Sequence, residues 1–111
     1  MRKKPSPGSI GSTPFPVRHA LAKLGRDLGN ARKRRRLTQK IVAARAGISR
    51  GTLIKLEKGD GGVSLESFAR VLFALGMLDS LKDLADLRND PVGGTLLEED
   101  LPQRVRIKPK W

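Results

Sequence analysis

The stretch LTQKIVAARAGISRGTLIKLEKG, residues 37–59, determines the fold that the sequence predicts. Thr38 is a good N-cap for a short helix, and Gly47 would end that helix because glycine takes a positive φ without strain. Ser49 is a second N-cap, from which another helix would run until Gly59 ends it. Two short helices joined by a turn of three or four residues that contains glycine predict a helix-turn-helix.

Apolar residues recur at helical spacing before and after this stretch. One stripe predicts a helix over about residues 16–35, and a second predicts a helix from the N-cap Ser64 to Gly76. Leucines after Gly76 predict a fifth helix, over about residues 78–87. The side chains expected to form the apolar faces are Val17, Leu21, Leu24, Leu28, Ala31, Ile41, Val42, Ala46, Leu53, Leu56, Leu65, Phe68, Ala69, Leu72, Phe73, Leu75, Leu78, Leu81, Leu84, Ala85 and Leu87. The sequence thus predicts an all-α fold of five helices.

Composition divides the chain into three parts. Residues 1–14 are rich in Pro, Gly, Ser and Lys and are expected to be a disordered basic arm. Residues 15–88 carry the predicted helices and form one domain, because Asn89-Asp90-Pro91 breaks the pattern. Residues 89–111 form a C-terminal tail, in which the alternation at 105–107 favours a short strand.

Charge is unevenly distributed along the chain, whose formal net charge is +12. Residues 1–60 hold 16 basic and 3 acidic side chains, whereas residues 78–100 hold 2 basic and 7 acidic ones. Segregated charge gives one part of a protein a positive field suited to phosphate groups. The alternative is that the net charge only keeps the protein soluble, although solubility does not require sorted charges.

Residues that carry catalysis or hold metals are scarce. The chain has no Cys or Tyr, and its single histidine, His19, has no visible partner. The acidic cluster 98–100 lacks histidine and is expected to be a solvated charge patch. We therefore expect that the protein is not an enzyme and binds no metal and no cofactor.

The sequence also favours one location for the protein. It contains no run of 18 apolar residues that could span a membrane, and the N-terminus lacks the pattern of a signal peptide. The absence of cysteine fits a cytoplasmic protein.

The stretch at 37–59, followed by SLESFARVLFALG at 64–76, resembles the phage-repressor-like helix-turn-helix domains of the Cro and Xre family. The likeness covers roughly residues 21–76. One departure is Arg36, where that family usually has glycine. The residues that match the family's characteristic ones are Arg32, Thr38, Gln39, Ala43, Gly47, Ser49, Thr52, Leu53, Glu57 and Gly59.

This resemblance implies binding to double-stranded operator DNA, with the second helix of the motif in the major groove. Gln39 would bind a phosphate, and the planar fork of Arg50 suits the O6 and N7 acceptors of guanine. Glu57 is expected to serve the fold instead, through a buried hydrogen bond or ion pair. An open alternative is that the basic run 32–36 grips phosphates or RNA without sequence preference. The candidate DNA-binding residues are Arg35, Arg36, Thr38, Gln39, Ser49, Arg50, Gly51, Thr52 and Lys55.

Partners other than DNA are expected from the second half of the chain. A small reading domain gains contact area by pairing on a palindrome, so we expect a homodimer, with the leucines of the fifth helix as the candidate interface. The alternative is that these leucines close the core of the monomer, and the two roles are compatible. The segment 86–111 resembles the C-terminal region of HipB-type antitoxins, which implies a HipA-like kinase toxin as partner and Trp111 as an anchor. The alternatives are a stand-alone Xre-family repressor and a coactivator-like module.

Overall fold

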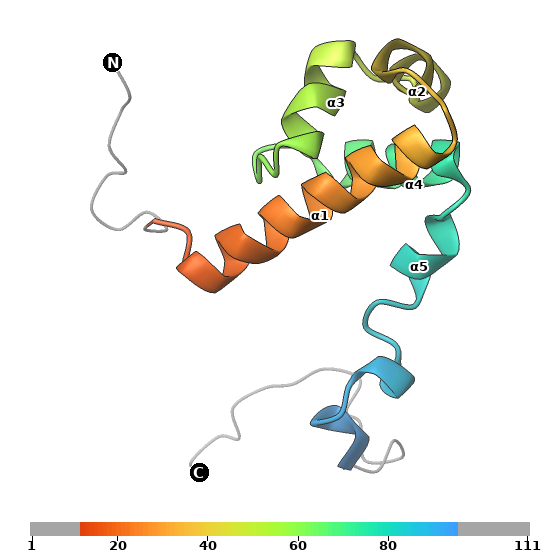
Figure 1. The fold of residues 1–111 in the computed structure, drawn as a ribbon. Helices are drawn as coiled ribbons and strands as arrows, with labels where there is room; N and C mark the ends of the chain where they lie inside the picture. Colours follow the sequence, from red (N-terminus) through yellow and green to blue (C-terminus); the bar gives the residue numbers. More distant parts are fainter. Residues whose placement is uncertain (1–11, 96–111) are drawn as a thin grey trace, which may run out of the picture. The chain divides into compact units, whose positions relative to one another are not determined.

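Residues 12–95 are described by a computed structural model, which is all-α, without a strand in that range. The helices are α1 (Phe15–Arg34), α2 (Gln39–Ala46), α3 (Arg50–Glu57), α4 (Leu65–Leu75) and α5 (Leu78–Lys82), as Figure 1 shows. Two short 3₁₀ turns follow, η1 (Leu87–Asn89) and η2 (Gly93–Thr95). The predicted all-α fold of five helices is confirmed. The expected basic arm up to residue 11 and the expected strand at 105–107 lie outside the described residues.

Local capping interactions determine where the central helices begin and end. The hydroxyls of Thr38, Ser49 and Ser64 each accept a hydrogen bond from the backbone N–H three residues later, at 3.0–3.1 Å. Gly47 and Gly76 end α2 and α4 in the left-handed conformation, with φ of 71° and 76°. These signals depend only on neighbouring residues, which is why the sequence located the helix ends to within about one residue.

The chain divides into two compact units, the first ending at Leu78 and the second beginning at Asp79. The core of the first unit lies between α1, α2, α3 and α4: α2 packs against both α3 and α4, and α1 packs against α3. Its buried apolar side chains are Leu28, Ala31, Val42, Ala43, Ala46, Leu53, Leu56, Val71, Leu72 and Leu75. Burial of these side chains, at about 25 cal/mol per Å² of apolar surface, is the main force that holds the helix-turn-helix in place.

In the first four helices, four side chains that we expected on the inward faces are exposed instead. Ile41 and Val17 are 40% and 47% exposed, and Leu65 and Phe73 are 70% and 68% exposed. Val17 lies in the first turns of α1, where the described residues place no core, and Ile41 is next to the narrow inward stripe of the eight-residue α2. On α4, residues 71, 72 and 75 face the core, which leaves Phe73 on the opposite side of the helix. Apolar periodicity alone did not distinguish these faces.

The fifth helix is shorter than predicted. It ends at Lys82 and not near residue 87. Carboxylates at a helix C-terminus oppose the macrodipole, and Asp83 and Asp86 stand where the helix would have continued. Asp86 instead accepts a hydrogen bond from the backbone N–H of Arg88 at 2.9 Å and starts η1. Leu84 and Leu87 are 63% and 48% exposed. The leucine spacing therefore did not produce a long amphipathic helix.

Candidate nucleic-acid interface

The turn between α2 and α3 is built as the motif requires. Gly47 takes the left-handed conformation, and the backbone N–H of Ile48 donates to the carbonyl of Ala43 at 3.0 Å. Ser49 then caps α3, and its hydroxyl also lies 2.8 Å from that of Thr52. Together, the turn at Gly47 and the cap at Ser49 set the angle between α2 and α3 and leave the first residues of α3 at the surface.

A bidentate ion pair at the base of the motif joins α1 to α3. The Nε of Arg32 lies 2.7 Å from Oε2 of Glu57 and its Nη2 donates to Oε1 at 3.1 Å, with both side chains only 11% exposed. Arg32 also donates to the carbonyl of Leu37 at 2.9 Å, and the side-chain amide of Gln39 donates to Oε1 of Glu57 at 3.0 Å. We call these four residues the Glu57 network. It ties α1, α2 and α3 together, as expected for Glu57.

The contacts of the Glu57 network change the pKa of Glu57. Burial alone would raise the pKa of Glu57, but hydrogen bonds from Arg32 and Gln39 and the nearby positive charge outweigh it, so the pKa lies below its ordinary value. The pKa of Arg32 is raised, chiefly by its hydrogen bonds to Glu57 and despite partial burial. The pair is therefore ionised at neutral pH, and its charges are directed at each other and not at a ligand.

The exposed face of α3 carries the side chains expected to read bases. Arg50, Gly51 and Lys55 are exposed, Thr52 is half-buried, and Leu53 and Leu56 face the core. Among the described residues, the side-chain atom nearest to a Cβ added at Gly51 would be Ser49 Oγ, at 3.9 Å. Glycine in a helix costs about 1 kcal/mol relative to alanine. Packing within the described residues therefore gives no reason for glycine at this position.

The end of α1 contributes a second group of cations. Arg35 is exposed and its guanidinium donates to the carbonyl of Ala31 at 2.8 Å, so it would leave that bond to reach a phosphate. Arg36 has a φ of 55°, the one positive φ at a residue other than glycine in residues 12–95. An L-residue in this conformation costs roughly 1–2 kcal/mol. Arg36 thus occupies a turn that suits the glycine of the resembled family, and the helix still closes through Leu37 N–H to the Arg32 carbonyl at 3.2 Å.

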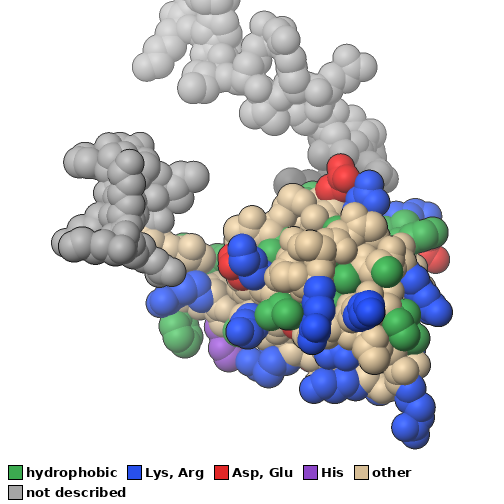
Figure 2. All heavy atoms as spheres, turned by 90° about the horizontal axis from the view of Figure 1, so that it is seen from above, with side chains coloured by type: hydrophobic (Ala, Val, Ile, Leu, Met, Phe, Trp, Pro, Cys, Tyr) green, Lys and Arg blue, Asp and Glu red, His purple; other side chains and the backbone are tan. Residues whose placement is uncertain are grey.

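Positive charge gathers where these elements meet. Figure 2 looks onto the side on which α2 and α3 lie in Figure 1, and Lys and Arg side chains are spread over it, with few acidic ones among them. The structure brings Arg35, Arg36, Thr38, Gln39, Ser49, Arg50, Gly51, Thr52 and Lys55 to the end of α1, to the start of α2 and to α3. Trp111 lies outside the described residues. Such a basic surface around an exposed helix start suits a polyanion.

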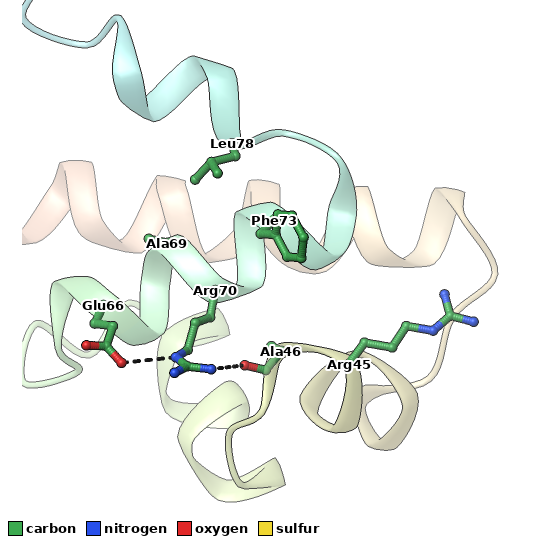
Figure 3. A pocket seen from close by; sticks show the side chains of 7 residues that line it. All are labelled: Arg45, Ala46, Glu66, Ala69, Arg70, Phe73 and Leu78. Carbon is green, nitrogen blue, oxygen red and sulfur yellow. Dashed lines mark hydrogen bonds and ion pairs between the residues drawn. The ribbon is translucent and has the colours of Figure 1, made fainter.

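Two features that support this surface were missed by the sequence analysis. A Cβ at Gly25 of α1 would lie 2.6 Å from the carbonyl oxygen of Glu57, so only glycine lets α1 approach the end of α3 this closely. Arg70 of α4 pairs with Glu66 at 3.0 Å and donates to the carbonyl of Ala46, the last residue of α2, at 3.3 Å (Figure 3). Gly25 is one step from the predicted apolar stripe of α1. A helical glycine beside such a stripe is the signal that could have revealed the close crossing.

Residues 12–95 contain no group of three His, Cys, Asp or Glu side chains placed to hold a metal ion. None of the helices in that range is both long enough and apolar enough to cross a membrane.

Comparison with known proteins agrees with this geometry. The family model of the helix-turn-helix domain matches residues 23–85, more than half of the chain. No curated protein and no solved structure matches the chain significantly. The match includes the turn, both helices of the motif and all of α4. The chain therefore belongs to the helix-turn-helix domain family, in its Xre- and Cro-like form, and contains a DNA-binding domain.

Proposed function

We propose that this protein is a sequence-specific transcriptional repressor that binds operator DNA as a homodimer. The observation that supports this most strongly is the surface of α3, where Arg50, Gly51 and Lys55 are exposed on a helix held firmly by the Glu57 network. In the proposed complex Arg50 contacts the edge of a guanine, and Gly51 lets the helix backbone come close to the bases. Thr52 and Lys55 extend the contact along the groove.

The remaining candidates position the protein on the DNA backbone. Thr38 caps α2, whose free N–H groups and positive dipole end would face a phosphate. The amide of Gln39 has a second hydrogen besides the one given to Glu57, and that hydrogen can reach the same phosphate. Arg35 and Arg36 add cations at the end of α1. These contacts would set the register of α3, and Ser49 would serve by capping it.

Selection of binding sites from random double-stranded DNA tests this proposal. We expect enrichment of one sequence with twofold symmetry, whose half-sites lie about 34–36 Å apart, one turn of the double helix. Footprints on the selected site should be symmetric, and a reporter promoter that contains the site should be repressed. Binding without sequence preference, or protection of a single asymmetric half-site by a strict monomer, would contradict the proposal.

We further propose that this repressor is the antitoxin of a HipA-like kinase toxin. The support is the likeness of segment 86–111 to HipB-type antitoxins, together with an aromatic residue, Trp111, in a basic stretch. Removal of residues 104–111 should weaken binding to such a kinase and leave operator affinity nearly unchanged, with Trp111→Ala reproducing much of the loss. If the cations of this segment bind flanking DNA instead, the truncation will weaken DNA binding and spare the kinase. If the protein is a stand-alone repressor, neither the full-length protein nor the truncated one will bind the kinase.

A further inference from the structure

The outer side of α4 carries an apolar stripe that the core does not use. Leu65, Ala69 and Phe73 follow each other at intervals of four residues, so they lie along one face of the helix. Leu65 and Phe73 are 70% and 68% exposed, and Ala69 is half-buried between them. The stripe therefore has a large side chain at each end and a small one in the middle. An apolar stripe that runs along an exposed helix face is a candidate contact surface.

An open pocket of about 300 Å³ lies beside this stripe (Figure 3). Its lining is mostly apolar and includes Ala69 and Phe73 of the stripe. The charged side chains that line it are Glu66, Arg70 and Arg45. Pockets that bind small molecules enclose roughly 300–1,000 Å³. This one is at the lower limit and is not enclosed, so it suits a side chain of another protein better than a ligand. The charged residues of the lining are of both signs, so two copies of this surface can pair opposite charges.

We propose that α4 packs against α4 of a second copy of this chain, antiparallel, about a twofold axis at Ala69. In that register Ala69 meets its own copy, and Leu65 of each chain meets Phe73 of the other. The order large, small, large is the same read in either direction, so the stripe is complementary to itself under a twofold axis. The small central residue lets the two helices approach closely. This proposal rests on the dimer of the proposed function and assigns its interface to α4 in place of the fifth helix.

The arrangement also suits the reading of DNA by two subunits. Figure 3 looks onto the pocket beside the stripe, with α4 running across the view and α2 and α3 on one side of it. A twofold axis perpendicular to α4 in the plane of that view reverses α4 and keeps α2 and α3 of both copies on the same side. Both α3 helices would then face one DNA duplex.

The size of the stripe limits the strength of this dimer. α4 has 11 residues and is therefore roughly 16 Å long. A stable interface buries about 800 Å² on each partner, more than one face of so short a helix provides. The free protein should therefore dimerise weakly, and two neighbouring half-sites should complete the pairing.

Disulfide crosslinking tests the position of the axis directly. The chain has no cysteine, so a single introduced thiol has no competitor. The variant Ala69→Cys should form a covalent dimer under mild oxidation, because a residue on a twofold axis lies next to its own copy within disulfide range. Operator DNA should speed this reaction. Asn30→Cys, at an exposed position of α1, is the matched control and should crosslink far more slowly. Equal crosslinking of the two variants would overturn the proposal.

A second variant measures the energy of the contact. Phe73→Glu should weaken self-association about 30-fold or more in sedimentation equilibrium, since aromatic anchors concentrate interface energy. Circular dichroism should show an unchanged fold, because Phe73 contributes little to the core. Affinity for an isolated half-site should stay unchanged while cooperative binding to the full site is lost. A dimer that survives Phe73→Glu refutes the α4 interface, whereas wild-type protein that binds no specific DNA refutes the proposed function instead.

Discussion

Residues 37–59 and the segment after Gly76 carry equally regular patterns in the sequence, yet only the first folded as its pattern predicts. In the first, caps at Thr38 and Ser49 and a left-handed Gly47 define both helices. In the second, leucines at helical spacing gave only five residues of α5, and Leu84 stayed 63% exposed. Capping signals specify backbone geometry locally. Apolar spacing indicates which side chains could be buried, but it does not determine which other residues would cover them.

The largest effect that this comparison predicts is at the Glu57 network. Glu57→Ala leaves Arg32 without its partner, at a site where both side chains are 11% exposed. We expect the free energy of unfolding to fall by about 3 kcal/mol, since an uncompensated charge remains partly buried. Chemical denaturation measures this. A loss below about 0.5 kcal/mol would mean that the pair behaves like a surface ion pair and does not hold α3.

The same residue predicts how stability depends on pH. The pKa of Glu57 is lower in the folded protein than its ordinary value of 4.5. Its contribution is therefore complete above about pH 4.5 and is lost as the pH falls through the lowered pKa of the folded state. Glu57→Gln should lack this component, so its stability relative to the wild type should improve on acidification.

Gly25→Ala should produce the next largest effect. The added Cβ would lie within 2.7 Å of backbone atoms of residues 56, 57 and 59, which cannot move aside singly. Overpacking of this kind costs about 2–3 kcal/mol, seen as a lower denaturation midpoint. Gly51→Ala is the matched control, because its Cβ has open space and should raise stability by up to about 1 kcal/mol. Similar losses in both variants would contradict the close crossing of α1 and α3.

Arg36→Gly should be a smaller change and of opposite sign. Glycine removes the strain of a φ of 55° but makes the unfolded chain more flexible, so the net gain should be about 0.5–1 kcal/mol. Loss of one cation should also reduce the salt dependence of DNA binding by about one unit. Arg36→Ala separates the two effects, since it removes the charge and retains the strain.

The smallest effect is expected in the second region. Leu84→Ala should change the free energy of unfolding by less than about 0.5 kcal/mol, because the side chain is mostly exposed. Thermal unfolding of this variant beside Leu53→Ala, whose leucine is fully buried, measures the contrast between the two regions. A loss of 2 kcal/mol or more, about the cost of emptying a core site, would mean that Leu84 is covered in the folded protein.

The sequence predicted the first four helices and the turn, because caps and glycines are local signals, and it also predicted that Glu57 serves the fold. It did not predict that Gln39 would donate to Glu57, since that contact joins helices whose crossing angle had to be known. Phe73 was assigned to the core because α4 is apolar on more than one face. Gly25 was missed because its role depends on the backbone of α3. In each case the missing information was the placement of one helix against another.

Reading of base pairs by α3 is the central claim, and Arg50 tests it most directly. Affinities of wild type, Arg50→Ala and Arg35→Ala are measured on the selected operator, on single-base variants and on unrelated DNA, over a range of salt. Arg50→Ala should cost about 1–3 kcal/mol on the operator and relax the preference at one base position. Arg35→Ala should weaken all duplexes equally and reduce the salt slope by about one unit. If both variants changed only non-specific binding, α3 would not be the reading helix.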